Sequence, residues 1–300
     1  MIDKTFPIAE QRRIVAEAEQ GMDLVDALET QFAASRATRR QPPLRPRRRT
    51  HYLTTHEAMT AQDLFNQSDR LVSSYPIGTL KLPPGYPIAG CGFFPVVSGS
   101  FHSESLTTQV GQRKLLFVGQ DWGCEDNLTA LCDKNADIKS GTGKILLNLL
   151  IEAKIPLDEC FFTNALFGVR KGKTNTGASP GWNDPKFVGG CAEAMKDQIA
   201  AVRPRGIVCL GRDAPKLLAR LLSECVLWKT AKSFKAIDAA GCAVVSVTSF
   251  PRIDVAAILL HPSFRRANAR HRSYGGSVKL EAELKILANV WSQVSSEPPS

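Results

Sequence analysis

The chain has 300 residues, of which 43% are hydrophobic and 22% are charged, and this is the composition of an ordinary globular protein. Such a length gives one large domain or two small ones, and the composition excludes fibrous, collagen-like and fully disordered proteins. The 38 Lys and Arg residues outnumber the 29 Asp and Glu residues. The resulting net charge of +9 favours polyanionic partners, nucleic acid before anionic membranes.

The sequence contains no apolar run of about 18 residues that would span a membrane, and its first twenty residues carry charges throughout. We therefore expect a cytoplasmic protein without a membrane partner, associated with the nucleoid if it is bacterial. The eight cysteines include no Cys-X-X-Cys pair and several lie in apolar runs, which predicts free thiols rather than disulfides. Because the histidines show no ligand spacing with cysteines, we expect no metal and no other cofactor.

Residues 7–34 have a helical pattern with a break at 21–23, and a strongly basic segment follows at 36–49. Three prolines exclude a regular helix in this segment, and repulsion between its arginines favours an extended arm. The arm is either a solvated linker or a phosphate-binding element that gains affinity by counterion release. We assign residues 1–60 to the N-terminal helical segment and basic arm, and residues 61–300 to an α/β domain.

Residues 75–103 are rich in Pro and Gly and are expected to form loops or irregular strands. From about residue 113 onward, short apolar runs alternate with amphipathic segments. The apolar runs predict strands at 114–118, 160–164, 206–210, 243–247 and 256–260. The amphipathic segments predict helices at 142–153, 195–202, 217–222 and 278–294. This order predicts an α/β fold, a three-layer α/β/α sandwich with a central, mostly parallel sheet, plus an N-terminal helical extension.

Polar clusters follow four of the predicted strands, at Gly119–Gly123, Thr163–Ala165, Gly211–Asp213 and His261–Arg266. The carboxyl ends of parallel strands meet at one edge of a sheet and carry the working residues of such folds. Taken singly, Asp121 is explained as a helix cap, Asn164 as a turn former and His261 as a structural histidine. Their convergence at one edge predicts a functional site instead.

Between about residues 113 and 275 these clusters resemble the motifs of the uracil-DNA glycosylase superfamily. Gly119-Gln120-Asp121 is similar to the motif that supplies a water-positioning carboxylate and backbone amides to the base. Phe162-Thr163-Asn164 is similar to the strand whose asparagine reads the base. Leu260-His261-Pro262-Ser263 is similar to the motif whose histidine supports the departing base oxygen. The resemblance implies a DNA glycosylase that flips its target base out of the duplex.

The resemblance implies two catalytic residues. Asp121 would orient water and stabilise positive charge on the sugar, and His261 would donate a hydrogen bond to the oxygen of the leaving base. Asn164 would distinguish bases by its amide donor and acceptor. The implied base-binding residues further include Gly119, Gln120, Trp122, Gly123 and Ile138.

The loop after His261 is expected to enter the minor groove. Phe264 is either a wedge that fills the space of the flipped base or a side chain packed against the last helix. The expected DNA contacts are Ser263, Phe264, Arg265, Arg266, Arg270, Arg272, Arg170, Lys171 and Lys173. The last three begin a polar loop that extends to about Asp184 and is expected to be mobile until DNA binds.

The sequence departs from the family pattern at several positions. The uracil-selective branch has a proline and then a tyrosine that blocks a 5-methyl group, and here these places hold Trp122 and Gly123. Ile138 falls near the position of the base-stacking aromatic, a role for which Trp122 is a candidate. In the iron–sulfur branch four cysteines hold a cluster. Cys191 matches one of them, but Gly168 replaces another and the N-terminal Cys-X-X-Cys is missing, so we expect no cluster.

These departures lead to a hypothesis about the substrate. Loss of the methyl-excluding side chain predicts a monofunctional, monomeric glycosylase that removes uracil or another modified, even bulky, pyrimidine from DNA and leaves an abasic site. Hypermodified bases of invading phage DNA are one such class. No lysine occupies a motif position as a Schiff-base nucleophile, which argues against a lyase step. The alternatives are a non-catalytic DNA-binding protein on the same fold and an RNA-directed or structural protein.

Overall fold

The computed structural model of the chain describes residues 59–82, 110, 113–127, 142–174 and 176–296. The chain divides into two compact units, Met1–Leu53 and Thr54–Ser300, and every described residue belongs to the second. The helices predicted within 7–34, the basic arm and Ile138 lie outside the described residues and stay predictions. Among the described residues, no helix is long and apolar enough to cross a lipid bilayer.

A five-stranded sheet forms the centre of the second unit, in the order β3-β2-β5-β7-β6. Four strands run parallel to one another and are buried along their whole length, namely β2 (Leu115–Gly119), β3 (Cys160–Asn164), β5 (Gly206–Leu210) and β7 (Val255–Leu259). Their unbroken apolar sequences suit strands that are covered on both faces. The fifth strand, β6 (Val244–Ser246), runs antiparallel to β7. The prediction of a mostly parallel sheet is therefore confirmed, and the predicted strand at 243–247 is its antiparallel edge because only a short connection joins it to β7.

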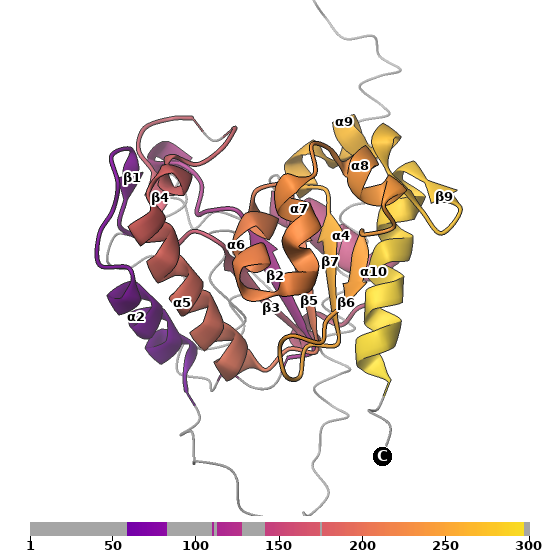
Figure 1. Ribbon diagram of the computed structural model, residues 1–300, viewed down its shortest axis with the longest axis horizontal. Coiled ribbons are helices and arrows are strands. Elements are labelled where there is room, and N and C mark those ends of the chain that lie inside the picture. The colour runs from indigo at the N-terminus through magenta and orange to yellow at the C-terminus, as the bar shows by residue number, and fades with distance from the viewer. Residues whose placement is uncertain (1–58, 83–109, 111–112, 128–141, 175, 297–300) are drawn as a thin grey trace, which may run out of the picture. The chain divides into compact units, whose positions relative to one another are not determined.

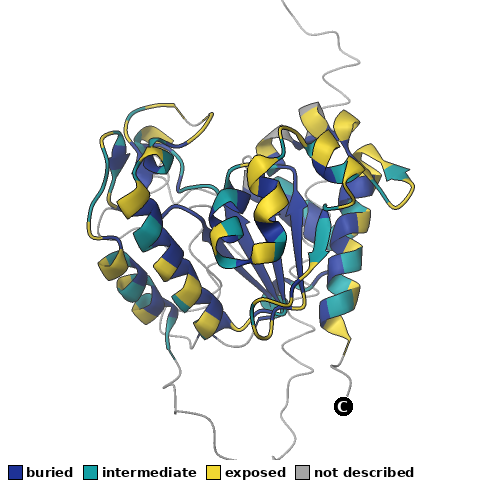
Figure 2. Ribbon diagram, viewed as in Figure 1, coloured by how far each residue is buried: buried dark blue, intermediate teal, exposed yellow. Residues whose placement is uncertain are grey.

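Helices cover both faces of this sheet, which confirms the predicted α/β/α arrangement. Figure 1 shows α6 and α7 in front of the strands and α4 behind them. Figure 2 shows that the four parallel strands are buried while the helices turn exposed residues outward. The helices are α2 (Ala61–Leu71), α4 (Thr142–Glu152), α5 (Pro185–Val202), α6 (Ala214–Leu221), α7 (Val226–Thr230), α8 (Phe234–Ala239), α9 (Arg265–Asn268) and α10 (Lys279–Ser295).

Short elements complete the unit. Two two-stranded ribbons are antiparallel: β1 (Thr79–Leu80) pairs with β4 (Val169–Arg170), and β8 (Ser273–Tyr274) pairs with β9 (Ser277–Val278). The 3-10 turns are η2 (Leu157–Glu159), η3 (Pro180–Asn183), η4 (Ser223–Cys225), η5 (Pro262–Phe264) and η6 (Ala269–His271). The η5 turn directly follows β7 and His261, so it begins at the carboxyl edge of the sheet.

Helix α2 was absent from the sequence-based prediction. It begins with a capping box in which Thr60 and Asp63 satisfy each other's backbone amides. Its buried face is short, and it packs closely against α5, where an added Cβ at Gly190 would lie 2.6 Å from the carbonyl oxygen of Leu71. A largely polar helix of this kind is stabilised by its tertiary neighbour rather than by its own apolar stripe.

Two adjacent glycines of α5 provide a test of this close packing. Gly190→Ala would force α2 and α5 apart, and we expect the free energy of unfolding to fall by about 1–3 kcal/mol. Gly189→Ala is the matched control, because no atom lies within 4 Å of an added Cβ there. Alanine favours the helix over glycine, so we expect this variant to be more stable by about 0.5–1 kcal/mol. Urea denaturation measures both, and equal effects would contradict the close approach.

Candidate active site at the carboxyl edge of the sheet

The loops after β2 and β3 run together at the carboxyl edge of the sheet. Gly119 lies opposite Asn164 in the parallel register. Beyond the strands, the amide of Ala165 donates to Gly119 O at 2.8 Å and the amide of Leu166 donates to Gln120 O at 2.9 Å. These bonds hold the backbone that carries Asp121 against the backbone that carries Asn164.

Asp121 forms a buried ion pair with Arg170, whose Nε lies 2.6 Å from Asp121 Oδ2. The two side chains are only 5% and 7% exposed. The other carboxylate oxygen accepts from the Gly123 amide at 3.1 Å, and Arg170 Nη1 donates to Thr176 O at 2.8 Å. The prediction that Arg170 is a phosphate contact is therefore wrong: its guanidinium is turned inward, where it fixes the carboxylate and the loop that follows β4.

His261 is the second residue after the end of β7, and it packs against the loop after β5. An added Cβ at Gly211, which has φ +84°, would lie 3.2 Å from His261 Cβ. His261 Nδ1 accepts a hydrogen bond from the Ser263 amide at 3.3 Å. A neutral imidazole that accepts at Nδ1 carries its proton at Nε2, so Nε2 is the donor nitrogen.

The electrostatic surroundings of His261 connect it to the ion pair. Burial is the largest influence and lowers the pKa of His261 from 6.5, the Asp121 carboxylate raises it, and the Arg170 guanidinium lowers it. Side chains from the ends of β2 and β7 and from β4 therefore lie within electrostatic reach of one another. The structure brings together the acid and the imidazole that the sequence analysis selected.

Asn164 is buried at the end of β3, and its side-chain amide bears on what the site can bind. Among the described residues, no group accepts a hydrogen bond from its Nδ2. A buried donor without a partner costs about 1–3 kcal/mol, so such groups are commonly sites where a ligand or water binds. The amide beside Gly119 and Gln120 can therefore read a donor and acceptor pattern.

Trp122 does not have the position predicted for a base-stacking residue. It is 1% exposed, and its ring packs edge-on against Phe65 and Phe167 at centroid distances of 6.1 and 5.3 Å. The prediction of Trp122 as a stacking residue is therefore wrong, because both neighbours hold the indole in the core. The next residue, Gly123, has φ +78°, a conformation that favours glycine.

The residues that match the iron–sulfur branch do not fit a cluster. Burial raises the pKa of the Cys191 thiol to about 12, and this thiol accepts a hydrogen bond from the Phe167 amide. At Gly168 an added Cβ would lie 2.8 Å from Thr79 Cγ2, so packed side chains occupy the space of a second cysteine. Among the described residues, no group of three His, Cys, Asp or Glu side chains is placed to hold a metal ion.

The predicted DNA contacts differ in exposure. Lys171, Arg270 and Ser263 are exposed, and the Lys173 side chain is 89% exposed. Arg265 is buried, and burial is the main cause that lowers its pKa, so its prediction as a phosphate contact is not supported. The side chains of Phe264 and Arg266 lie outside the described residues, and their roles stay predictions.

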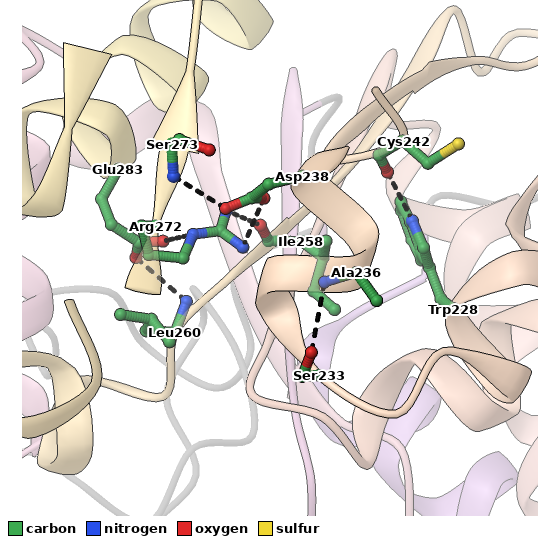
Figure 3. Close-up of polar contacts among 10 residues, drawn as sticks. All are labelled: Trp228, Ser233, Ala236, Asp238, Cys242, Ile258, Leu260, Arg272, Ser273 and Glu283. Atoms are coloured by element: carbon green, nitrogen blue, oxygen red, sulfur yellow. Dashed lines mark hydrogen bonds and ion pairs between the residues drawn. The ribbon is translucent and has the colours of Figure 1, made fainter. Parts of the chain in front are cut away.

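Arg272, expected as a phosphate contact, is instead the centre of a buried charge network (Figure 3). Its guanidinium lies 3.1 Å from Asp238 Oδ1 and 2.7 Å from Glu283 Oε1, and it donates to Ile258 O at 3.0 Å. Glu283 Oε2 accepts from the Leu260 amide at 2.9 Å, and Asp238 Oδ2 accepts from the Ser273 amide at 2.8 Å. The three charged side chains are at most 1% exposed.

This network determines where His261 lies. The Leu260 amide, which Glu283 of α10 holds, belongs to the residue directly before His261, and Ile258 O belongs to β7 itself. Asp238 brings α8 into the same cluster. Sequence reasoning missed this role because Arg272 stands among other arginines, and no local pattern separates a buried arginine from an exposed one.

Removing the central cation tests the network. Arg272→Met leaves two buried carboxylates without their counterion, and we expect the free energy of unfolding to fall by about 3–5 kcal/mol. Lys196→Met is the control, because Lys196 pairs with Glu193 at 2.7 Å on the surface, where the expected loss is under about 1 kcal/mol. Urea denaturation compares the two variants. A loss in Arg272→Met as small as that in the control would show that the two carboxylates do not depend on Arg272 as their counterion.

Comparison with known families agrees with this geometry. The family model described as Uracil DNA glycosylase superfamily matches residues 107–285, a range that contains every strand of the central sheet together with Asp121, Asn164 and His261. No curated protein matches the chain. The family match covers more than half of the sequence, and the chain belongs to the uracil DNA glycosylase superfamily.

Proposed function

We propose that this protein is a monofunctional DNA glycosylase that flips and removes uracil or another modified pyrimidine, and that it acts as a cytoplasmic monomer. Membership of the superfamily indicates DNA glycosylase activity of the uracil-DNA type. The observation that carries the proposal is that Asp121 lies within electrostatic range of His261 at one edge of the sheet, since a protein that only binds DNA has no need of this pair.

Cleavage of an N-glycosidic bond separates charge. The bond breaks with its electron pair moving to the base, which leaves negative charge on the base and positive charge on the sugar. Water then forms a bond to the sugar carbon and releases a proton to solvent, and the departed base takes up a proton, which leaves an abasic site and the free base. Groups that stabilise these charges must be rigid before the reaction begins.

Asp121 has the rigidity that its proposed role requires. Arg170 and the Gly123 amide hold both carboxylate oxygens, so the carboxylate has one orientation. Each oxygen retains a further lone-pair direction that can accept from water. In this role Asp121 orients the attacking water and stabilises the sugar cation, while Arg170 is a positioning residue.

His261 and Asn164 act on the base. The Nε2 donor of neutral His261 stabilises negative charge on a base oxygen, as preorganised donors do in other enzymes. The Asn164 amide, which has no acceptor among the described residues, donates to the edge of the flipped base. Together the two side chains bind the base by its polar edge.

Gly123 supports a substrate range wider than uracil. The position where the uracil-selective branch has a methyl-blocking tyrosine carries no side chain here, and its backbone conformation favours glycine. A pyrimidine with a substituent at carbon 5 meets no blocking ring at this residue. Bulky bases of the kind that phages place in their DNA are therefore within the proposed substrate class.

Excision assays test the function. Duplex and single-stranded oligonucleotides with uracil, hypoxanthine, 5-hydroxymethylcytosine or glucosylated cytosine are incubated with the protein, and alkali converts abasic sites into strand breaks. We expect excision of at least one pyrimidine, slowed by about 10²–10⁴-fold in Asp121→Asn. Asp126→Asn, an exposed acid in the same loop, is the control and should retain the wild-type rate. Tight binding without any excision would favour the non-catalytic DNA-binding protein instead.

The neutral state of His261 predicts a pH dependence. Because its folded pKa lies below 6.5, the imidazole is neutral above that pH and becomes charged only as the pH falls further. Protonation replaces the acceptor at Nδ1 by a second donor that faces the Ser263 amide. We expect single-turnover excision to be level down to about pH 6.5 and to decline below it. His261→Gln should be slow without this inflection, and an unchanged inflection in that variant would assign it to another group.

A further inference from the structure

The stretch from α7 to α8 presents three exposed lysines. Lys229, Lys232 and Lys235 are all exposed, and among the described residues none of them forms an ion pair. The acid of the same stretch, Asp238, is turned inward onto Arg272 at 3.1 Å (Figure 3). The exposed charges from Lys229 to Lys235 are therefore all positive, and we call residues 229–235 the α7–α8 basic surface.

Two sets of contacts place this surface beside the candidate active site. Gly211 packs against His261, and the next residue, Arg212, donates from Nη2 to Ala231 O at 3.0 Å. Ala231 stands between Lys229 and Lys232 in the chain. The surface is therefore two contacts away from His261 at the carboxyl edge of the sheet.

The far end of the stretch is held by the buried charge network. Asp238 Oδ2 accepts from the Ser273 amide at 2.8 Å, and Arg272 lies over the Phe234 ring at 4.7 Å from its centre. Helix α8 also packs against β8 (Ser273–Tyr274). Both ends of the stretch are therefore bonded to residues that follow β5 and β7, the strands that lead to the candidate site.

We propose that the α7–α8 basic surface is a second DNA-binding surface, which contacts the phosphates of the strand backbone next to the flipped base. This inference rests on the proposed function and extends it beyond the residues of the family motifs. Lysine is a flexible point charge that suits phosphate contacts without sequence preference. In Figure 1, β4, which precedes Lys171 and Lys173, lies to the left of the central strands, and α8 lies to their right. In this proposal a bound duplex therefore has cationic contacts on both sides of the site.

Salt-dependent binding of the full chain tests the surface. The triple variant Lys229→Gln, Lys232→Gln and Lys235→Gln is titrated with an unmodified duplex at several salt concentrations by fluorescence anisotropy. Each lost phosphate contact reduces the slope of log K against log salt by about 0.9, so we expect it to flatten by about 2.7. Because the N-terminal basic arm is present in both proteins, the difference between their slopes belongs to the lysines.

A matched variant with the same change of charge is the control. Lys154, Arg203 and Arg252 are exposed basic residues that precede β3, β5 and β7, so they lie at the opposite, amino edge of the sheet. Their triple glutamine variant should keep the wild-type slope. Thermal unfolding of both triple variants verifies that each is folded.

The outcomes separate the surface from the enzyme activity. A flattened slope only in the lysine variant supports the surface, whether or not any base is excised. Excision by the wild type with equal slopes in all three proteins would overturn the proposed DNA-binding surface but not the proposed glycosylase function. Equal flattening in both triple variants would overturn the surface, because total charge alone would then explain the change, and absence of DNA binding by the wild type would overturn both proposals.

Discussion

Arg272 lies between two carboxylates in the interior of the protein, and the geometry of the carboxyl edge depends on this arrangement. Its guanidinium pairs with Asp238 of α8 and Glu283 of α10 and also bonds to the backbone of β7. A buried ion pair contributes little net stability compared with apolar packing, but it tolerates only one geometry, because each charge must keep its partners. The network therefore specifies the end of β7, and with it the position of His261.

A second buried pair, Asp121 with Arg170, orders the opposite side of the same site. The Asp121 carboxylate lies beside a cation that is itself fixed by Thr176 O, so neither side chain is free to turn. The Asp121 carboxylate raises the pKa of His261 and the Arg170 guanidinium lowers it, while burial favours the neutral imidazole. A site with these features holds a negative group for the sugar and a neutral donor for the base, which agrees with the charge separation of glycosidic cleavage.

Much of this organisation was predictable from local sequence. Continuous apolar runs specify the buried parallel strands, and polar clusters after those runs specify which edge carries the chemistry, because parallel strands end on the same side. Helix α2 was not predictable, since its buried face has few apolar residues and its stability depends on packing against α5, which is distant in the sequence. The antiparallel direction of β6 was likewise missed, because an apolar run contains no information about its direction in a sheet.

The amino-acid sequence by itself determined the fold class, the superfamily and the identity of Asp121, Asn164 and His261 as candidate residues, since these depend on short-range patterns and their order. Only the tertiary structure decided which basic residues are exposed. Arg170 and Arg272 resemble surface arginines in the sequence, yet both are buried on carboxylates that are distant in the chain. Trp122, similarly, is held in the core by Phe65 and Phe167. Whether such a side chain is buried or exposed depends on its partner and not on its own chemistry. The partner becomes known only when the chain is folded.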